Sequence, residues 1–211
     1  GDGTEEIVRH LAHEAPADAL FFASIHLYDE GDNSFTRFYP GSGGADALVA
    51  NVVNVPVAPH WRRAGGGVGR VSKASGGRLE WRQAFAQRVI PALRAFCPQL
   101  LLLSSGFDGA ERDVGNSMID DADKYHQGLD LGPADFEWMT EQLMSVAACC
   151  CPGKVVSVLE GGYGSYVFCK ESETGWAIER DGLSENVLAH ATALAGTRYR
   201  KVSGELTAGA L

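Results

Sequence analysis

Two side chains of this 211-residue chain combine reactive chemistry with a favourable position. Asp108 closely follows an apolar run within the turn-like string Ser104–Gly109, and Tyr163 lies between glycines within Glu160–Gly164. A carboxylate can bind a cation through oxygen, cap a helix or pair with a base, and a phenol can donate a hydrogen bond to a developing oxyanion. The structural alternatives are that the Asp only forms a turn, and that the Tyr packs on a sheet end with its hydroxyl in water.

The segments that lead to these side chains predict strands alternating with helices. Gln99–Ser105 and Val155–Leu159 are apolar and of strand length, while Leu79–Phe96 and the stretch that starts at Pro133 have helical periods. Such alternation is typical of an α/β fold with a parallel sheet. Because ligands bind at the carboxyl ends of parallel strands, the carboxylate and the phenol should face one crevice.

Two details of these segments make sharper predictions. The unbroken apolar run Leu100–Leu103 predicts a strand that is covered on both faces, and Pro91 predicts a kink or a break in its helix. The other predicted elements are helices over Thr4–Glu14 and Leu183–Leu194, strands over Ala19–Ile25 and Asn51–Val57, and loops over His26–Ala47, His60–Gly77 and Gly106–Gly132.

Composition narrows the class of protein. With 45% hydrophobic residues the chain can bury a core, and its net charge of −9 disfavours a surface that tracks nucleic-acid phosphates. No stretch approaches the roughly 20 apolar residues of a membrane-spanning helix. The five cysteines include no C-x-x-C pair, which disfavours a disulfide framework or a zinc finger and favours a reducing intracellular compartment. The start at Gly1, without an initiator Met, suggests a fragment.

The strings around Asp108 and Tyr163 resemble, in the right order, the two signature turns of zinc-dependent histone deacetylases, and class II-like members are the best match. The resemblance extends from Gly1 to about Gly164. It implies an α/β, parallel-sheet, three-layer arginase/deacetylase-like fold that is incomplete at the N-terminal side, with residues 1–211 forming part of the catalytic domain. The other matching stretches are Ile25–Gly31, Phe38–Gly43, Asn51–Pro56 and Pro133–Trp138.

The resemblance also implies roles for individual residues. Asp108 would be a carboxylate ligand of a catalytic zinc ion, and Tyr163 would be the phenol that polarises the acetyl-lysine carbonyl. Tyr39 would line the channel for the lysine methylenes, and Gly162 would also contact the substrate. The chemistry implied is metal-assisted hydrolysis of an amide.

The zinc site that the family implies is only partly present in this chain. The family's other ligands come from an Asp-x-His-His-Gly stretch and a further His pair, and Gly1–Thr4 is similar to the residues that follow that stretch. None of the six histidines matches those ligands. One Asp cannot supply three protein ligands, so the isolated chain should bind zinc poorly and show little turnover. Ser24 and Ile25 match a stretch that helps to hold a structural potassium ion.

The function implied is hydrolysis of N-acetyl-lysine in histones or other proteins, with possible corepressor-type partners, no direct nucleic-acid or membrane contact, and the nucleus slightly favoured over the cytoplasm. Two alternatives remain: a non-catalytic interaction module on the same scaffold, and an amidohydrolase acting on acetylated polyamines.

The acidic stretch Glu111–Gln127, with Asp113, is predicted to be a solvated surface loop. Gly65–Arg70 lacks the features of a phosphate loop and is predicted to be a flexible loop.

Overall fold

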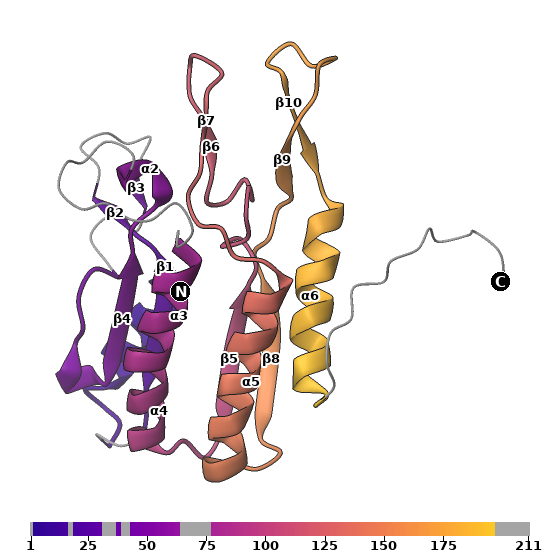
Figure 1. Ribbon diagram of the computed structural model, residues 1–211. Helices are drawn as coiled ribbons and strands as arrows, with labels where there is room; N and C mark the ends of the chain where they lie inside the picture. Colours follow the sequence, from indigo (N-terminus) through magenta and orange to yellow (C-terminus); the bar gives the residue numbers. More distant parts are fainter. Residues whose placement is uncertain (1, 17–18, 31–36, 39–42, 64–76, 197–211) are drawn as a thin grey trace, which may run out of the picture.

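The computed structural model describes residues 2–16, 19–30, 37–38, 43–63 and 77–196 (Figure 1). Tyr39 and Gly65–Arg70, both discussed above, lie outside these residues. The helices are α1 (Asp2–Leu11), α2 (His60–Arg63), α3 (Gly77–Ala84), α4 (Ile90–Phe96), α5 (Pro133–Cys150) and α6 (Asp181–Leu194), with a 3-10 turn η1 (Leu48–Ala50) and a π-helix η2 (Phe85–Val89). The strands are β1 (Phe22–Leu27), β2 (Asp29–Glu30), β3 (Arg37–Phe38), β4 (Val52–Val57), β5 (Leu101–Gly106), β6 (Met118–Ile119), β7 (Tyr125–His126), β8 (Val155–Glu160), β9 (Ser165–Phe168) and β10 (Trp176–Glu179).

Two pairs of parallel strands form the centre of the fold. β1 pairs with β4 from Phe22↔Val52 onward, and β5 pairs with β8 from Leu101↔Val155 to Gly106↔Glu160. Figure 1 shows α5 lying along the β5–β8 pair, with α6 beside α5. The predicted α/β class with parallel pairing is confirmed.

One hydrophobic core joins the two pairs of strands. Val55 of β4 and Leu101 of β5 belong to the same buried cluster, together with Val146 of α5. Phe85 and Val89 also reach this cluster from the helix that precedes β5, as their spacing of four residues predicts. A second cluster lies toward the carboxyl ends of the strands, and it includes Leu27, Val57, Phe107, Leu129, Leu131 and Phe136. This second cluster therefore packs against the carboxyl ends of β1, β4 and β5.

The helix predicted over Leu79–Phe96 stays helical throughout, but its hydrogen bonding changes just before the proline. α3 and α4 are separated by η2, where the Ile90 N–H donates to the Phe85 carbonyl, and Pro91 lies in the first turn of α4. Proline has no N–H to donate, so the hydrogen-bond ladder shifts by one residue before it. The predicted break into two helices is not found, and the proline instead follows a π-helical segment within one continuous helical stretch.

The strand β5 is covered on one face only within the described part of the chain. Leu101 is 7% exposed, but Leu102 is 67% exposed, and Val156 and Val158 of β8 are about half exposed on the same open face. The prediction of a strand buried on both faces is therefore wrong. An apolar run shows that a strand can be buried, but it does not show what covers its second face.

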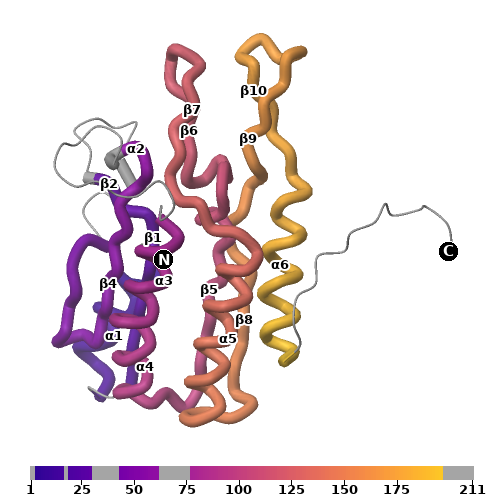
Figure 2. Tube along the Cα trace, viewed as in Figure 1, coloured from indigo at the N-terminus to yellow at the C-terminus, as the bar shows by residue number. Residues whose placement is uncertain are grey.

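The structure contains two hairpins that the sequence analysis did not predict. β6 and β7 form an antiparallel hairpin inside the predicted polar loop, and β9 and β10 form another directly after Tyr163. Figure 2 shows both rising beyond the β5–β8 pair on the same side of the molecule. They touch through Tyr125 and Trp176, whose ring centroids are 5.4 Å apart, and the Trp176 indole N–H donates to the Asp123 carbonyl at 3.0 Å. Likewise, part of the predicted loop His60–Gly77 is the short helix α2.

The helix α1 contacts β4 but supplies no member of the two core clusters. Its buried Glu5 pairs with Arg9 one turn later. Within the described residues, no helix has both the length and the apolar composition needed to cross a bilayer.

Candidate active site

Asp108 and Tyr163 meet at one edge of the β5–β8 pair. The paired residues Gly106 and Glu160 end the two strands, so the Asp and the Tyr follow within a few residues at the same edge. Gly115 lies between them: a Cβ built on this glycine would be 2.9 Å from the Asp108 Cβ and 2.8 Å from the Tyr163 ring. The structure therefore places the Asp108 Cβ and the Tyr163 ring on either side of one glycine, at the edge where both strands end. That the carboxylate and the phenol face one crevice stays a prediction.

The glycines before Tyr163 allow the chain to turn back over Asp108. Gly161 has a φ of +60° and Gly162 a φ of +100°, which side-chain-bearing residues rarely adopt. A Cβ on Gly161 would lie 3.1 Å from the Asp108 carboxylate oxygen. A Cβ on Gly162 would instead meet Leu183 and Phe107, so this glycine packs closely on the interior. Its contact with a substrate stays a prediction.

Asp113 ties the loop after Asp108 to the turn that carries Tyr163. Its Oδ1 accepts the Gly115 N–H at 2.7 Å, and its Oδ2 accepts the N–H groups of Tyr163 at 2.9 Å and Gly164 at 3.2 Å. The residue is only 3% exposed, so the prediction of a solvated loop is wrong at this position. Burial raises the pKa of the Asp113 carboxyl, while the hydrogen bonds from these backbone groups act in the opposite direction.

Asn116 fixes the turn of Asp108 from the other side. Its side-chain amide donates to the Asp108 carbonyl at 2.5 Å and to the Ala110 carbonyl at 2.7 Å, and its Oδ1 accepts the Leu129 N–H at 2.7 Å. The side chain is buried. Sequence reasoning missed this residue and Asp113. The only signal for them is the string of Asp, Gly and Asn types that favours tight turns.

The electrostatics of the site favour a positive or neutral partner for Asp108. Burial raises the pKa of its carboxyl above the ordinary value, its own backbone N–H acts against this, and the negative charges of Asp113 and Glu160 raise it further. A half-buried carboxylate beside other carboxylates is stabilised when a cation or a hydrogen-bond donor reaches it. Tyr163 is 57% exposed, so a ligand can reach its side chain.

The described residues do not by themselves fit a catalytic zinc site. Within the described ranges, no three side chains of His, Cys, Asp and Glu type come together as a metal ion would require. A catalytic zinc site takes three protein ligands and keeps a position for water. The role of Asp108 as one ligand of such a set stays a prediction.

His26 of β1 forms hydrogen bonds with a neighbouring side chain and with a backbone carbonyl. The His26 ring bonds to the Ser24 hydroxyl at 2.9 Å and to the Gly43 carbonyl at 3.1 Å. The Gly43 carbonyl can only accept, so the His26 Nε2–H is the donor in that bond. Ser24 and Ile25 lie on β1, and their part in holding potassium stays a prediction.

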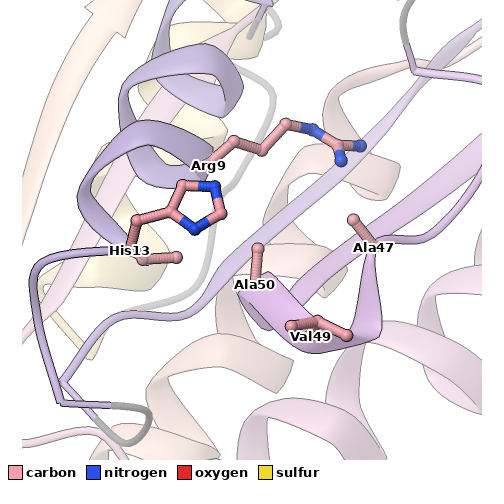
Figure 3. A pocket seen from close by; sticks show the side chains of 6 residues that line it. Arg9, His13, Ala47, Val49 and Ala50 are labelled. Carbon is pink, nitrogen blue, oxygen red and sulfur yellow. The ribbon is translucent and has the colours of Figure 1, made fainter.

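A recess of about 300 Å³ lies elsewhere, between α1 and η1 (Figure 3). None of its lining residues belongs to the loops around Asp108 and Tyr163, so it is separate from the candidate site. The residues that line it are Arg9, Ala12, His13, Ala47, Val49 and Ala50.

Comparison with known proteins gives consistent matches. A family model described as the histone deacetylase domain matches residues 1–178. The chain is 34% identical over 176 residues to histone deacetylase 7 of Homo sapiens, which covers 82% of this chain and 15% of that protein. It is 31% identical over 172 residues to type-2 histone deacetylase 2 of Dictyostelium discoideum, which covers 78% of this chain and 8% of that protein.

A solved structure also matches this chain. The crystal structure of the HDA15 HD domain matches with a TM-score of 0.53 and 27% identity, covering 83% of this chain and 38% of that chain. The chain thus spans less than half the length of each of these relatives.

Proposed function

The chain belongs to the histone deacetylase family, with an incomplete α/β arginase/deacetylase fold, and we propose that it forms part of a catalytic domain that hydrolyses N-acetyl-lysine in histones or other proteins. The observation that supports this activity best is the placement of the Asp108 Cβ and the Tyr163 ring on either side of Gly115. The Tyr163 side chain is not needed there for packing, because it is more than half exposed.

Tyr163 has the chemistry that amide hydrolysis requires. When water attacks the acetyl carbonyl, the carbonyl oxygen gains negative charge in the tetrahedral intermediate. A phenol held in place by its backbone can donate a hydrogen bond to that oxygen, which stabilises the transition state more than the ground state. The backbone N–H of Tyr163 donates a hydrogen bond to the Asp113 carboxylate, which holds this part of the turn.

Zinc is the cofactor that the family implies, and Asp108 is the residue that we assign to it. The described residues do not supply a complete set of zinc ligands. The role proposed for Tyr163 is therefore argued without a metal ion. Tyr39 and Gly162 would contact the lysine side chain, and Ser24 and Ile25 would help to hold potassium. Corepressor-type partners and residence in the nucleus rather than the cytoplasm belong to the same proposal.

The proposed activity is tested on the protein expressed from its full coding sequence. It should release acetate from an acetyl-lysine histone peptide, and Tyr163→Phe should lower kcat by about 10²-fold or more. Tyr166→Phe is the matched control, because this nearby Tyr packs its ring against Tyr125 in the hairpins and should leave turnover unchanged. Turnover of an acetylpolyamine in preference to the peptide would assign the alternative substrate class. Turnover of neither would contradict the proposal and favour a non-catalytic module.

A further inference from the structure

We propose that Asp113 is a positioning residue that holds the Tyr163 phenol at the candidate site. This inference rests on the proposed function, in which the phenol stabilises the oxyanion. Asp113 would not touch the substrate. It would act through the backbone of the turn in which Tyr163 lies.

The bonding of the Asp113 carboxylate supports this role. Both of its oxygens accept hydrogen bonds from backbone N–H groups, one from Gly115 and two from Tyr163 and Gly164. The residue is 3% exposed, and no Lys or Arg among the described residues forms an ion pair with it. A buried carboxylate needs such donors, and hydrogen bonds to a charged acceptor are stronger than neutral ones. The carboxylate is thus held by the segments that it joins.

The surrounding backbone shows why this side chain matters for Tyr163 itself. The loop that carries Asp113 and the segment after Tyr163 also pair through their backbones. The Val114 N–H donates to the Gly164 carbonyl and the Tyr166 N–H donates to the Arg112 carbonyl, both at 2.9 Å. Those bonds anchor the start of β9 but not the Tyr163 N–H. Asp113 makes the bond to Tyr163 and also holds Gly115, against which the Tyr163 ring lies.

The substitution Asp113→Asn tests the carboxylate with little change in size. Either orientation of the amide places an NH₂ group against a backbone N–H, because both carboxylate oxygens accept. Asp120→Asn is the matched control. Asp120 lies in the same loop and likewise accepts two backbone N–H groups, from Ala122 and Lys124, but these belong to the β6–β7 hairpin.

The first measurement is NMR spectroscopy of the labelled protein, and it needs no activity. Unaltered protein should show a coupling across the hydrogen bond between the Tyr163 amide nitrogen and the Asp113 carboxyl carbon. In Asp113→Asn, exchange of the Tyr163 and Gly164 amide hydrogens should rise about tenfold, and it should not change in Asp120→Asn. A missing coupling in the unaltered protein, or unchanged exchange in a folded Asp113→Asn, would overturn the proposal.

The second measurement separates positioning from a general structural role. In the full protein, Asp113→Asn should lower kcat roughly tenfold to hundredfold on an acetyl-lysine peptide, with little change in KM. Added to Tyr163→Phe, it should lower kcat little further, because both changes remove the same hydrogen bond to the oxyanion. Additive losses would contradict positioning through Tyr163. If the unaltered protein has no turnover, the proposed function fails, and the NMR measurement still decides whether Asp113 holds the turn.

Discussion

The ring of Tyr163 lies directly against Gly115, so closely that a Cβ on residue 115 would be 2.8 Å from the ring and 2.9 Å from the Asp108 Cβ. The backbone of Gly115 has no positive φ, so the glycine is required by this close approach and not by its conformation. One small residue thus separates the Asp108 Cβ from the Tyr163 ring.

Gly115→Ala should therefore impair the site more than the fold. The added methyl group must displace the exposed Tyr163 ring or the Asp108 turn, and we expect kcat on an acetyl-lysine peptide to fall at least about tenfold. The unfolding free energy should fall by no more than about 1–3 kcal/mol, the usual cost of overpacking. Gly3→Ala in α1 is the control, because a Cβ there meets nothing within 4 Å. Unchanged kcat in Gly115→Ala would show that this separation is not critical.

His190 should make the stability of the protein depend on pH. Its buried ring bonds to Thr140 at 2.7 Å and to Ser157 at 2.8 Å. The Thr140 hydroxyl donates to the Phe136 carbonyl, so its oxygen accepts from His190 Nδ1–H, and Nε2 accepts from Ser157. These are the bonds of the neutral ring, which is favoured because burial lowers the pKa of His190.

A lowered pKa in the folded state means that the unfolded chain takes up the proton first as the pH falls. The stability contributed by the neutral ring is complete above the unfolded value of about 6.5, and it is lost as the pH falls from there through the lower folded pKa. Melting temperatures measured between pH 8 and pH 5 should show this loss. His190→Gln should be less stable at pH 8 but lose less on acidification, while His10→Gln, at an exposed position, should follow the unaltered protein. Parallel pH profiles for all three proteins would contradict this account.

The isolated 211-residue chain should bind zinc poorly. Asp108 would supply one oxygen ligand, and a catalytic zinc ion takes three protein ligands. Metal analysis after dialysis against a trace of zinc should find much less than one ion per chain, with no difference between the unaltered chain and Asp108→Ala. Stoichiometric zinc that is lost in Asp108→Ala would contradict this expectation.

Neighbouring leucines of β5 should respond very differently to truncation. Leu101 is buried in the core, and Leu101→Ala should lower the unfolding free energy by about 2–5 kcal/mol. Leu102 lies on the open face, and Leu102→Ala should change it by no more than about 0.5 kcal/mol. Denaturant unfolding of both variants measures the contrast. Similar losses would mean that the second face of the strand is covered in solution.

Much of the fold follows from local sequence patterns. The apolar strands, the helix that begins at Pro133 and the π-helical segment before Pro91 all depend on periodicity and on the missing N–H of proline, which act within a few residues. The strings that end β5 and β8 likewise place Asp108 and Tyr163 at one edge, since parallel strands share their direction.

The tertiary structure alone decided which acidic residue supports the site. Asp113 and Asp120 have the same side chain in the same loop, yet one is buried beneath Tyr163 while the other accepts bonds within a hairpin. The bond that distinguishes them joins residues 50 positions apart. In the same way, the exposed face of Leu102 depends on what packs against it and not on its own apolar character. Local patterns report what a residue prefers, but burial and hydrogen bonding depend on distant segments that only the folded chain brings together.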